Sequence, residues 1–256
     1  MRILLTNDDG YRAPGINALF HALKHAGHEV TIVAPELNSS GASQSIAVYS
    51  PMSITKVDKY CYYVSSTPAD SVRLGLQVAY GSAKHYPDLV ISGINLGENI
   101  GEDVLYSGTV GAAREATLHG ISGIACSCQG PEFPHLAGGA QAIVDLVARL
   151  DKNFELLKEP FLWNVNLPNI PYEKIIGFEA TELGVRQMHK PMEKQITPKG
   201  HVVYWQGDSG DPEETHSISS DVAVMNKQNI VSITPLGILP TDYKQMPIIS
   251  ALTTSL

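Results

Sequence analysis

The chain has 256 residues, of which 43% are hydrophobic, and this is enough for one large domain or for one domain with an appendage. Its formal net charge is −8, and lysine and arginine do not cluster along the sequence. We therefore expect no nucleic-acid polymer as a partner, because affinity for a phosphate backbone depends on grouped basic residues.

The first part of the chain alternates predicted strands and helices. A short apolar strand at 3–5 precedes a helix at 14–27, and a strand at 28–35 follows. A strand, a helix and a strand within about thirty residues predict parallel pairing. The same alternation continues with a helix at 70–81 that has Asp70 as its N-cap, a strand at 88–93, a helix at 109–120, a strand at 121–127, a helix at 137–150 and a strand at 161–168.

The pattern changes after residue 167. Residues 172–184 and 200–208 look like strands around a loop, which predicts a hairpin-like insertion, and residues 220–236 return to a short helix and a strand. We predict an α/β fold with a Rossmann-like, doubly wound and mostly parallel sheet, a β-rich excursion and a C-terminal extension. Residues 1–167 would form the core that carries the site, and residues 168–256 the excursion and C-terminal segment of the same structural unit.

Polar clusters follow three of the predicted strands. They begin at Asn7, at Glu36 in "ELNSSGAS", and at Gly93 in "GINLGENIGEDVLYSGTVGAA". Ligands of an open parallel sheet bind outside the carboxyl ends of its strands. We therefore expect these three clusters to converge on one edge of the sheet.

Two adjacent carboxylates, Asp8 and Asp9, end the first predicted strand. They cannot both stay ionised in a low-dielectric site without a cation, and oxygen ligands favour Mg²⁺ or Mn²⁺. Such an ion would also allow an acidic protein to bind a phosphorylated substrate. The alternative is that one aspartate caps the following helix, but Pro14 indicates that this helix begins several residues later.

The second and third clusters offer neutral oxygen ligands. Ser39, Ser40, Ser43 and Ser45 are turn residues in one interpretation and metal or phosphate ligands in another. Asn95 and Asn99 offer amide oxygens, although a positive-φ turn is the interpretation that we favour for Asn99.

Ser107, Gly108 and Thr109 immediately precede a predicted helix. The free N–H groups and the dipole at a helix N-terminus form an anion site, and the hydroxyls there can either cap the helix or bind phosphate. The glycines match neither the dinucleotide-binding nor the Walker pattern. His189 and His216, in the loop-rich later part, are open candidates for an acid.

The location of the protein is predicted from its N-terminus and its cysteines. A charged motif follows six N-terminal residues, without a signal-peptide apolar region, and no long apolar run is present. Cys61, Cys126 and Cys128 form no CxxC pair, and an odd number fits a reducing compartment. We expect a cytoplasmic protein with no membrane partner.

At these residues the sequence resembles the SurE survival-protein phosphatases, a family of metal-dependent nucleotidases. The resemblance covers most of the chain, through "RILLTNDDGYRAPGI", "SSGASQSI", "STPADSVRLGL", "PDLVISGINLGENIGEDVLYSGTVGAAREA" and, more loosely, "SSDVAVMNKQNIVSITPL". Two departures from the family pattern are the loop "ELNSS", which lacks the basic residues that often precede the Ser-Gly motif, and Ser220-Asp221 in place of Thr-Asp.

The resemblance implies a Rossmann-like fold and dimers or tetramers with exchanged C-terminal segments, which makes 168–256 an oligomerisation segment. It implies one divalent metal ion per subunit. By motif, the metal ligands fall on Asp8, Asp9, Ser40 and Asn95. The implied phosphate contacts are Asn99, Ser107, Gly108 and Thr109.

We interpret the chain as a divalent-metal-dependent 5'-nucleotidase that hydrolyses nucleoside monophosphates by metal-activated water, with 3'-nucleotidase and exopolyphosphatase activities left open. Asp8 and Asp9 are the predicted catalytic residues. A covalent aspartyl phosphate is disfavoured, because haloacid-dehalogenase-type phosphatases separate their two aspartates by one residue, whereas "NDDGY" does not. The alternative function is a non-catalytic nucleotide- or sugar-phosphate-binding protein.

Overall fold

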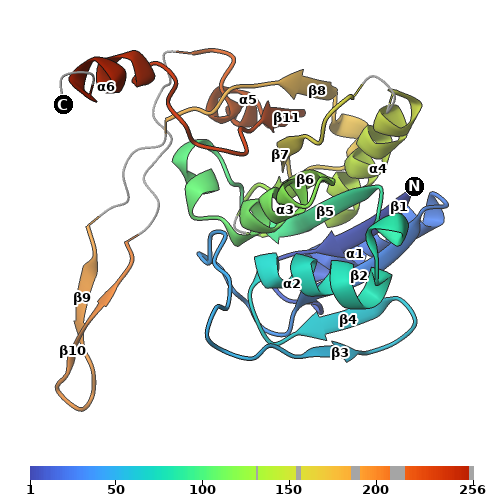
Figure 1. The fold of residues 1–256 in the computed structure, drawn as a ribbon, viewed down its shortest axis with the longest axis horizontal. Helices are drawn as coiled ribbons and strands as arrows, with labels where there is room; N and C mark the ends of the chain where they lie inside the picture. Colours follow the sequence, from blue (N-terminus) through green and yellow to red (C-terminus); the bar gives the residue numbers. More distant parts are fainter. Residues whose placement is uncertain (131, 154–156, 186–190, 208–216, 254–256) are drawn as a thin grey trace.

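The computed structural model describes residues 1–130, 132–153, 157–185, 191–207 and 217–253 (Figure 1). A nine-stranded sheet forms the centre of the molecule. Its strands, in their order across the sheet, are β3 (Ile54–Lys56), β4 (Cys61–Val64), β2 (Glu29–Pro35), β1 (Arg2–Thr6), β5 (Leu89–Leu96), β6 (Ser122–Cys128), β7 (Leu162–Leu167), β11 (Ile230–Pro235) and β8 (Gly177–Ala180). The pairs β3/β4 and β7/β11 are antiparallel and the other pairs are parallel, so the predicted doubly wound, mostly parallel sheet is confirmed.

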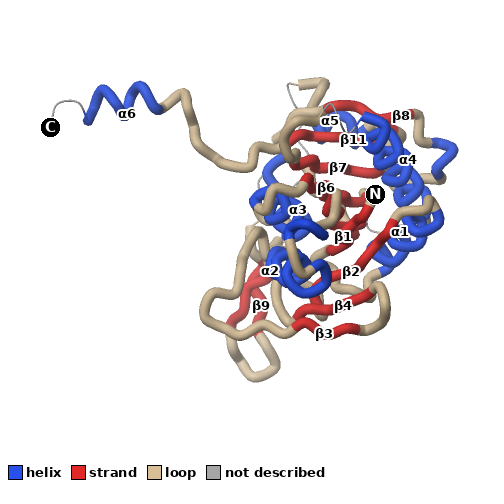
Figure 2. Tube along the Cα trace, turned by 45° about the vertical axis from the view of Figure 1, so that its right-hand side comes forward, coloured by secondary structure: helices blue, strands red, loops and turns tan. Residues whose placement is uncertain are grey.

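Helices cover both faces of this sheet. Helices α1 (Pro14–His25) and α4 (Leu136–Asn153) pack together on one face, and α2 (Pro68–Leu74) and α3 (Gly108–Leu118) lie on the other (Figure 2). Successive side chains of β1 pack on opposite faces of the sheet. Ile3 and Leu5 belong to the hydrophobic cluster under α1, whereas Leu4 belongs to the cluster under α2 and α3. The all-apolar character of the central strands is therefore a consequence of burial on two faces.

The helix predicted at 70–81 begins earlier and changes type. Thr67, not Asp70, is the N-cap: its side chain accepts a hydrogen bond from the Asp70 N–H, and Pro68 occupies the first turn. The prediction of Asp70 as N-cap was wrong. Proline is favoured at the first helical position because the N–H that it lacks would have no partner in the helix, so the helix begins at Pro68 and its N-cap is Thr67. From Gly75 to Tyr80 the chain continues as a π-helix.

The excursion differs in detail from the predicted hairpin. The strand within 172–184 is β8, which pairs with β11 in the main sheet. The hairpin instead joins β9 (Glu193–Ile196) to β10 (Val202–Trp205) and extends away from the body of the molecule (Figure 1). Strand β9 was missed because its sequence, EKQI, is exposed at all four positions and has no alternating apolar face.

Other elements complete the chain. Helix α5 (Asp221–Asn226) and β11 confirm the short helix and strand predicted at 220–236. Strands β3 and β4 and helix α6 (Met246–Thr253) were not predicted. Short 3-10 helices occupy Ala83–His85, Gly101–Leu105 and Tyr172–Lys174.

The sheet continues past residue 167, because β11 pairs with β7 and β8 pairs with β11. The division of the chain at residue 167 stays a prediction. Within the described residues, no helix combines the length and the apolar character needed to cross a bilayer.

Candidate metal and phosphate site

The chain reverses its direction across the sheet between β1 and β5. It proceeds from β1 to β2 and β4 on one side and returns to β5, β6 and β7 on the other. In open α/β sheets the ligand crevice lies outside the carboxyl ends of the strands at this switch point. Asp8 and Asp9 follow β1, and Asn95 lies at the end of β5, so the structure brings the first and third polar clusters to this crevice.

The turn after β1 is closed by the side chain of Asn7. Its Nδ2 donates to the carbonyl oxygen of Gly10 at 3.0 Å, and its Oδ1 accepts from the Gly10 N–H at 3.1 Å. Gly10 has φ +104°, which favours glycine. Helix α1 has Ala13 as its N-cap and no side-chain cap, so neither Asp8 nor Asp9 caps this helix.

Asp8 lies directly against the N-terminus of α3. The Thr109 hydroxyl donates to Asp8 Oδ1 at 2.6 Å, and both side chains are buried. A Cβ atom on Gly108 would lie 2.9 Å from the Asp8 Cβ and 3.0 Å from its Oδ2. Only a glycine at position 108 therefore allows the helix to approach the carboxylate this closely.

Asp9 has weaker protein partners than Asp8. Its Oδ2 accepts from the Leu96 N–H at 3.3 Å, and its Oδ1 accepts from Asn38 Nδ2 at 3.4 Å. Burial, followed by the nearby Asp8 carboxylate, raises the pKa of Asp9 to about 6. Burial also raises the pKa of Asp8, against the opposing effect of the Thr109 hydroxyl. Both carboxylates are thus unfavourable as anions unless a cation is added.

A bulge in β5 places Asn95. The pairing of β5 with β6 shifts between Ser92 and Asn95, and a Cβ atom on Gly93 would lie 2.2 Å from the Cys126 carbonyl oxygen. Bulges redirect the side chains that follow them. The Asn95 Nδ2 donates to the Gly97 carbonyl oxygen at 2.8 Å, which leaves its Oδ1 as the atom for a ligand.

Asn99 is held by neighbouring strands. Its N–H donates to Asn166 Oδ1 at 2.9 Å, and its carbonyl oxygen accepts from Asn164 and Asn166 at 2.8 and 3.0 Å. Its own Nδ2 donates to Ser127 Oγ at 2.7 Å. The expected positive-φ turn at Asn99 was wrong: among described residues other than glycine, only Ser43 and Gln228 have positive φ. These backbone and amide bonds satisfy a buried residue without such a turn.

Most of the predicted residues line one cavity of about 240 Å³, the site cavity. Its lining consists of Asp8, Ser40, Gly41, Asn95, Leu96, Glu98, Asn99, Asp103, Tyr106 and Ser107. Of the four candidate serines, Ser40 alone belongs to it. Ser107 is the N-cap of α3, since its Oγ accepts from the Val110 N–H at 3.2 Å. Gly108 and Thr109 stand behind Asp8, and Asp9 lies beside Leu96.

The charge of the site cavity decides what it can bind. Its lining contains three carboxylates and no lysine, arginine or histidine. A phosphate dianion would be repelled there unless a cation intervenes. No group of three histidine, cysteine or acidic residues suited to a metal occurs in the described part of the chain. The available set of two carboxylates with hydroxyl and amide oxygens fits a hard cation that keeps several water ligands, as Mg²⁺ does.

Sequence reasoning missed the buried acid that supports the Asn99 loop. Asp221 is fully buried, and its Oδ2 accepts from the Gly101 N–H at 3.0 Å. Its Oδ1 accepts from the N–H groups of Gly184 and Val222 at 2.7 and 2.8 Å. The available signal was Ser220-Asp221 before a short helix, a pattern that indicates a cap but not a contact 120 residues away.

A second network supports the chain after Ser40. Glu115 Oε2 accepts from Gln44 Nε2 at 2.8 Å, and the fully buried Asp70 accepts from the Ala47 N–H at 2.8 Å. These bonds fix the segment that continues from the site to α2 and α3. The two histidines considered as acids, His189 and His216, lie outside the described residues.

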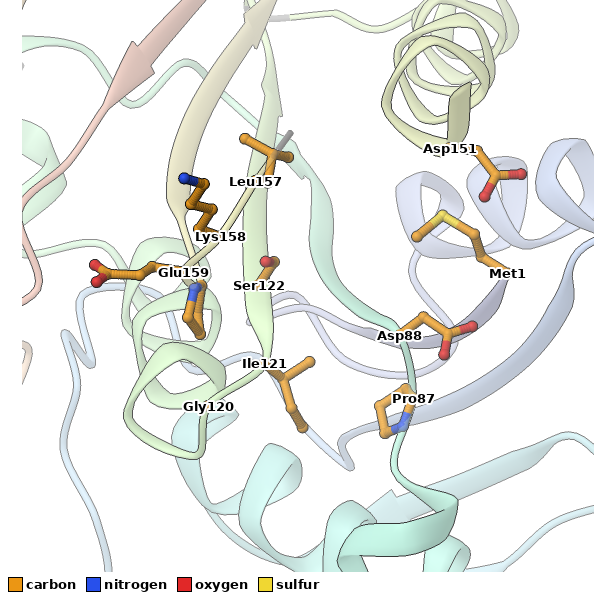
Figure 3. A pocket seen from close by; sticks show the side chains of 11 residues that line it. Met1, Pro87, Asp88, Gly120, Ile121, Ser122, Asp151, Leu157, Lys158 and Glu159 are labelled. Atoms are coloured by element: carbon orange, nitrogen blue, oxygen red, sulfur yellow. The ribbon is translucent and has the colours of Figure 1, made fainter. Parts of the chain in front are cut away.

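A larger cavity of about 560 Å³ lies at the opposite edge of the sheet (Figure 3). It is lined by residues at or before the beginnings of β1, β5 and β6, including Met1, Asp88 and Ser122. The carboxyl ends of these strands point away from it. Since ligands of such sheets bind at the carboxyl ends, its size does not make it the better candidate.

Known proteins are similar to this chain over nearly its full length. Residues 3–190 match the family described as "Survival protein SurE". The chain is 42% identical to "5'-nucleotidase SurE" of Methylobacillus flagellatus and 44% identical to that of Nitrosomonas eutropha, with 96% of each chain covered in both comparisons. The crystal structure of a SurE protein from Aquifex aeolicus aligns with a TM-score of 0.84 and 41% identity, covering 98% of this chain and 99% of that one. The chain therefore belongs to the SurE family.

Proposed function

We propose that this chain is a divalent-metal-dependent 5'-nucleotidase that hydrolyses nucleoside monophosphates. The observation that carries the proposal is the Asp8-Asp9 pair, two carboxylates of raised pKa at the switch point of the sheet, beside a cavity with no cationic lining residue. The names of relatives at 42% and 44% identity support the same activity. We assign one Mg²⁺ or Mn²⁺ per subunit.

The proposed ligands of the metal are Asp8, Asp9, Ser40 and Asn95. When bound, the ion would polarise the phosphoryl group and lower the pKa of a water molecule. The proposed phosphate contacts are Asn99 and Ser107, which line the cavity, and Gly108 and Thr109, which would contribute through their backbone N–H groups. The N–H groups at the start of α3 favour negative charge, and the Thr109 hydroxyl keeps Asp8 oriented.

The competing function is a non-catalytic nucleotide- or sugar-phosphate-binding protein. Such a protein usually neutralises phosphate with arginine, lysine or free backbone N–H groups. Here the site cavity has the N–H groups at the start of α3 but no arginine or lysine, and its lining includes Asp8, Glu98 and Asp103. Binding without turnover would therefore also need a metal held by the Asp8-Asp9 pair, and phosphate release distinguishes the two functions.

Phosphate release from metal-stripped protein tests the proposal. The purified chain is treated with chelator and assayed on nucleoside 5'- and 3'-monophosphates and polyphosphate, with and without added Mn²⁺ or Mg²⁺. We expect metal-dependent release from 5'-monophosphates that is lost in Asp8→Asn. Metal-dependent binding of a nucleotide without release would favour the binding protein.

The remaining assignments concern assembly and location. We propose a homodimer or homotetramer formed through residues 168–256, and its support is the exposure of large apolar side chains on the hairpin and on α6: Met192, Ile196, Val202, Tyr204, Ile248 and Leu252. A cytoplasmic location is supported by three unpaired cysteines. Light scattering of the full chain should give two or four subunits, and a monomer would refute the assembly.

A further inference from the structure

Ser40 differs from the other proposed metal ligands in how it is held. The other three lie in strands of the sheet or close to their ends, whereas Ser40 lies in an exposed loop after β2. On its N-terminal side this loop is anchored to the turn after β1, because the Ser39 N–H donates to the Asp8 carbonyl oxygen at 2.7 Å. The position of the Ser40 hydroxyl therefore depends also on what holds the loop on its C-terminal side.

The residues that follow Ser40 pack closely on the beginning of α3. The Ser43 N–H donates to the Tyr106 carbonyl oxygen at 2.9 Å, and the Ser43 Oγ donates to the Leu105 carbonyl oxygen at 2.7 Å. Ser43 has φ +52°, a conformation that side chains other than glycine rarely adopt. A Cβ atom on Gly111 would lie 2.2 Å from the Ser43 carbonyl oxygen, so a side chain at position 111 would push the loop away from the helix.

Gln44 attaches the same loop to a buried carboxylate of α3. Its Nε2 donates to Glu115 Oε2 at 2.8 Å. Glu115 is buried, and its Oε1 lies 3.3 Å from His119 Nε2 and 3.7 Å from Arg73 Nε. A carboxylate is a strong acceptor, and the neighbours of this one hold it in place. Glu115 is therefore a fixed point for the Gln44 amide.

One face of α3 makes the contacts with both parts of the metal site. The helix residues that touch them are spaced by three and by four positions, which places them on the same face. They are Gly108, beside Asp8, Gly111, beside Ser43, and Glu115, bonded to Gln44. A single helix therefore fixes the loop of Ser40 relative to the aspartates.

We propose that Glu115, acting through Gln44, is a positioning residue that holds the Ser40 hydroxyl where the cation of the Asp8-Asp9 pair can use it. This inference rests on the metal site of the proposed function. Neither Glu115 nor Gln44 lines the site cavity. Groups that orient a metal ligand without touching the metal commonly change metal affinity by about 10–100-fold.

Calorimetric titration of the chelator-treated full chain with Mn²⁺ tests this role. Gln44→Ala should raise the dissociation constant about tenfold, because the loop loses its bond to Glu115. The matched control is Gln141→Ala, since the Gln141 amide also donates to a carboxylate, that of Asp145 at 3.2 Å, on the exposed side of α4. The control should bind Mn²⁺ as the wild type does.

An exchange of donor and acceptor separates positioning from general damage. Gln44→Glu places a second carboxylate against Glu115 and should weaken Mn²⁺ binding more than Gln44→Ala does. The double variant Gln44→Glu/Glu115→Gln restores a hydrogen bond with the reverse polarity and should recover most of the lost affinity. Affinity no better in the double variant than in Gln44→Glu would contradict the proposal.

A double-mutant cycle tests whether the effect passes through Ser40. In the Ser40→Ala background, Gln44→Ala should cause no further loss of Mn²⁺ affinity, because the ligand that it positions is already absent. Fully additive losses would show that Gln44 acts elsewhere. An unchanged dissociation constant in Gln44→Ala alone, or an equal loss in the Gln141→Ala control, would also overturn the proposal.

Failure of the positioning role and failure of the proposed function give different results. Metal-dependent phosphate release by the wild type, with unchanged Mn²⁺ affinity in Gln44→Ala, overturns the positioning role alone. Mn²⁺ binding without phosphate release overturns the nucleotidase alone, and the titrations still decide the role of Glu115. If the wild type binds no Mn²⁺, the metal site fails, and the positioning role fails with it.

Discussion

Two pairs of acids in this chain differ in how the protein satisfies their carboxylates: Asp70 and Asp221 are fully buried, whereas Asp8 is buried and Asp9 is partly buried. Asp221 accepts three backbone N–H bonds of 2.7 to 3.0 Å, and Asp70 accepts one backbone N–H and two hydroxyls at 2.6 to 3.2 Å. Asp8 accepts a side-chain bond from Thr109 at 2.6 Å, with smaller contributions from the backbone N–H groups of Asp8 and Thr109, and Asp9 has only contacts of 3.3 and 3.4 Å.

The difference distinguishes structural acids from the acids that we propose as metal ligands. A buried carboxylate that stabilises a fold has its oxygens satisfied by the protein, because an unsatisfied charge is costly. The Asp8-Asp9 pair has fewer strong protein partners and lies at the crevice at the carboxyl ends of the strands. A bound cation there would offset the unfavourable free energy of the two charges. The following predictions change either the Asp8-Asp9 site or the structural acid Asp221.

The largest expected effect is the loss of activity in Asp8→Asn and Asp9→Asn. We expect metal-dependent phosphate release to fall by at least about a thousandfold, which corresponds to about 4 kcal/mol of transition-state stabilisation. The control is Asp88→Asn, a half-exposed aspartate that pairs with Arg2 and should retain activity. Turnover within tenfold of the wild type in both site variants would contradict the assignment.

The contrasting change is Asp221→Asn, which should act on stability and on substrate binding. Asparagine has one acceptor oxygen and would turn an N–H group toward at least one of the three donors. A loss of about 1–3 kcal/mol is expected, with a decrease in Tm of about 2–4 °C per kcal/mol. Because Asp221 holds the loop of Asn99, KM should rise about tenfold while the affinity for Mn²⁺ is unchanged.

A matched variant separates this effect from general damage to the excursion. Glu182→Gln alters the bonds of Ser217 and Ser219 at the base of the excursion without touching Gly101. Its KM should match that of the wild type. If both variants raised KM equally, Asp221 would not act through the Asn99 loop.

A smaller effect is expected from Thr109→Val. The variant keeps the shape of the side chain but removes the 2.6 Å hydrogen bond to Asp8, so the pKa of Asp8 rises further and the metal binds less tightly. The dissociation constant for Mn²⁺ should increase roughly fivefold to tenfold, as expected for about 1–1.4 kcal/mol. Thr109→Ser should restore the affinity, and an unchanged affinity in the valine variant would show that the bond is dispensable.

The smallest effect is the dependence of stability on pH without metal. The folded-state pKa of Asp9 is about 6, above its ordinary 3.8, so the folded chain binds this proton more tightly than the unfolded chain. The metal-free protein should therefore lose stability as pH rises through about 4 to 6 and level off above that range. Thermal melts should show the decrease in the wild type and a weaker decrease in Asp9→Asn. A rise in Tm over this range that the two proteins share would contradict the raised pKa.

Much of the fold follows from local patterns in the sequence. The core strands were predicted as short apolar runs, and the helices predicted at 14–27, 109–120 and 137–150 are found at 14–25, 108–118 and 136–153. Strand β9 and the hairpin pairing were not predicted, since an exposed strand without an apolar face has no such pattern. The N-cap of α2 is Thr67 and not Asp70, because Pro68 occupies the first turn, and the prediction from the apolar spacing did not take this proline into account.

The candidate site could be predicted where its residues are adjacent in sequence, but not where residues far apart in the sequence contact one another. Asp8, Asp9 and the Ser107–Thr109 turn follow from spacing and from the rule for strand ends. The role of Asp221 depends on a contact with Gly101 across 120 residues, and the role of Gly108 depends on its distance from Asp8. Such contacts exist only once the sheet has assembled.

The central claim is that Asp8 and Asp9 are open to a cation whereas Asp221 is closed, and a Mn²⁺ titration tests it most directly. Calorimetry of chelator-treated wild type, Asp8→Asn and Asp221→Asn should give one ion per chain in the first and third proteins and no binding in the second. Equal binding by wild type and Asp8→Asn would contradict the account.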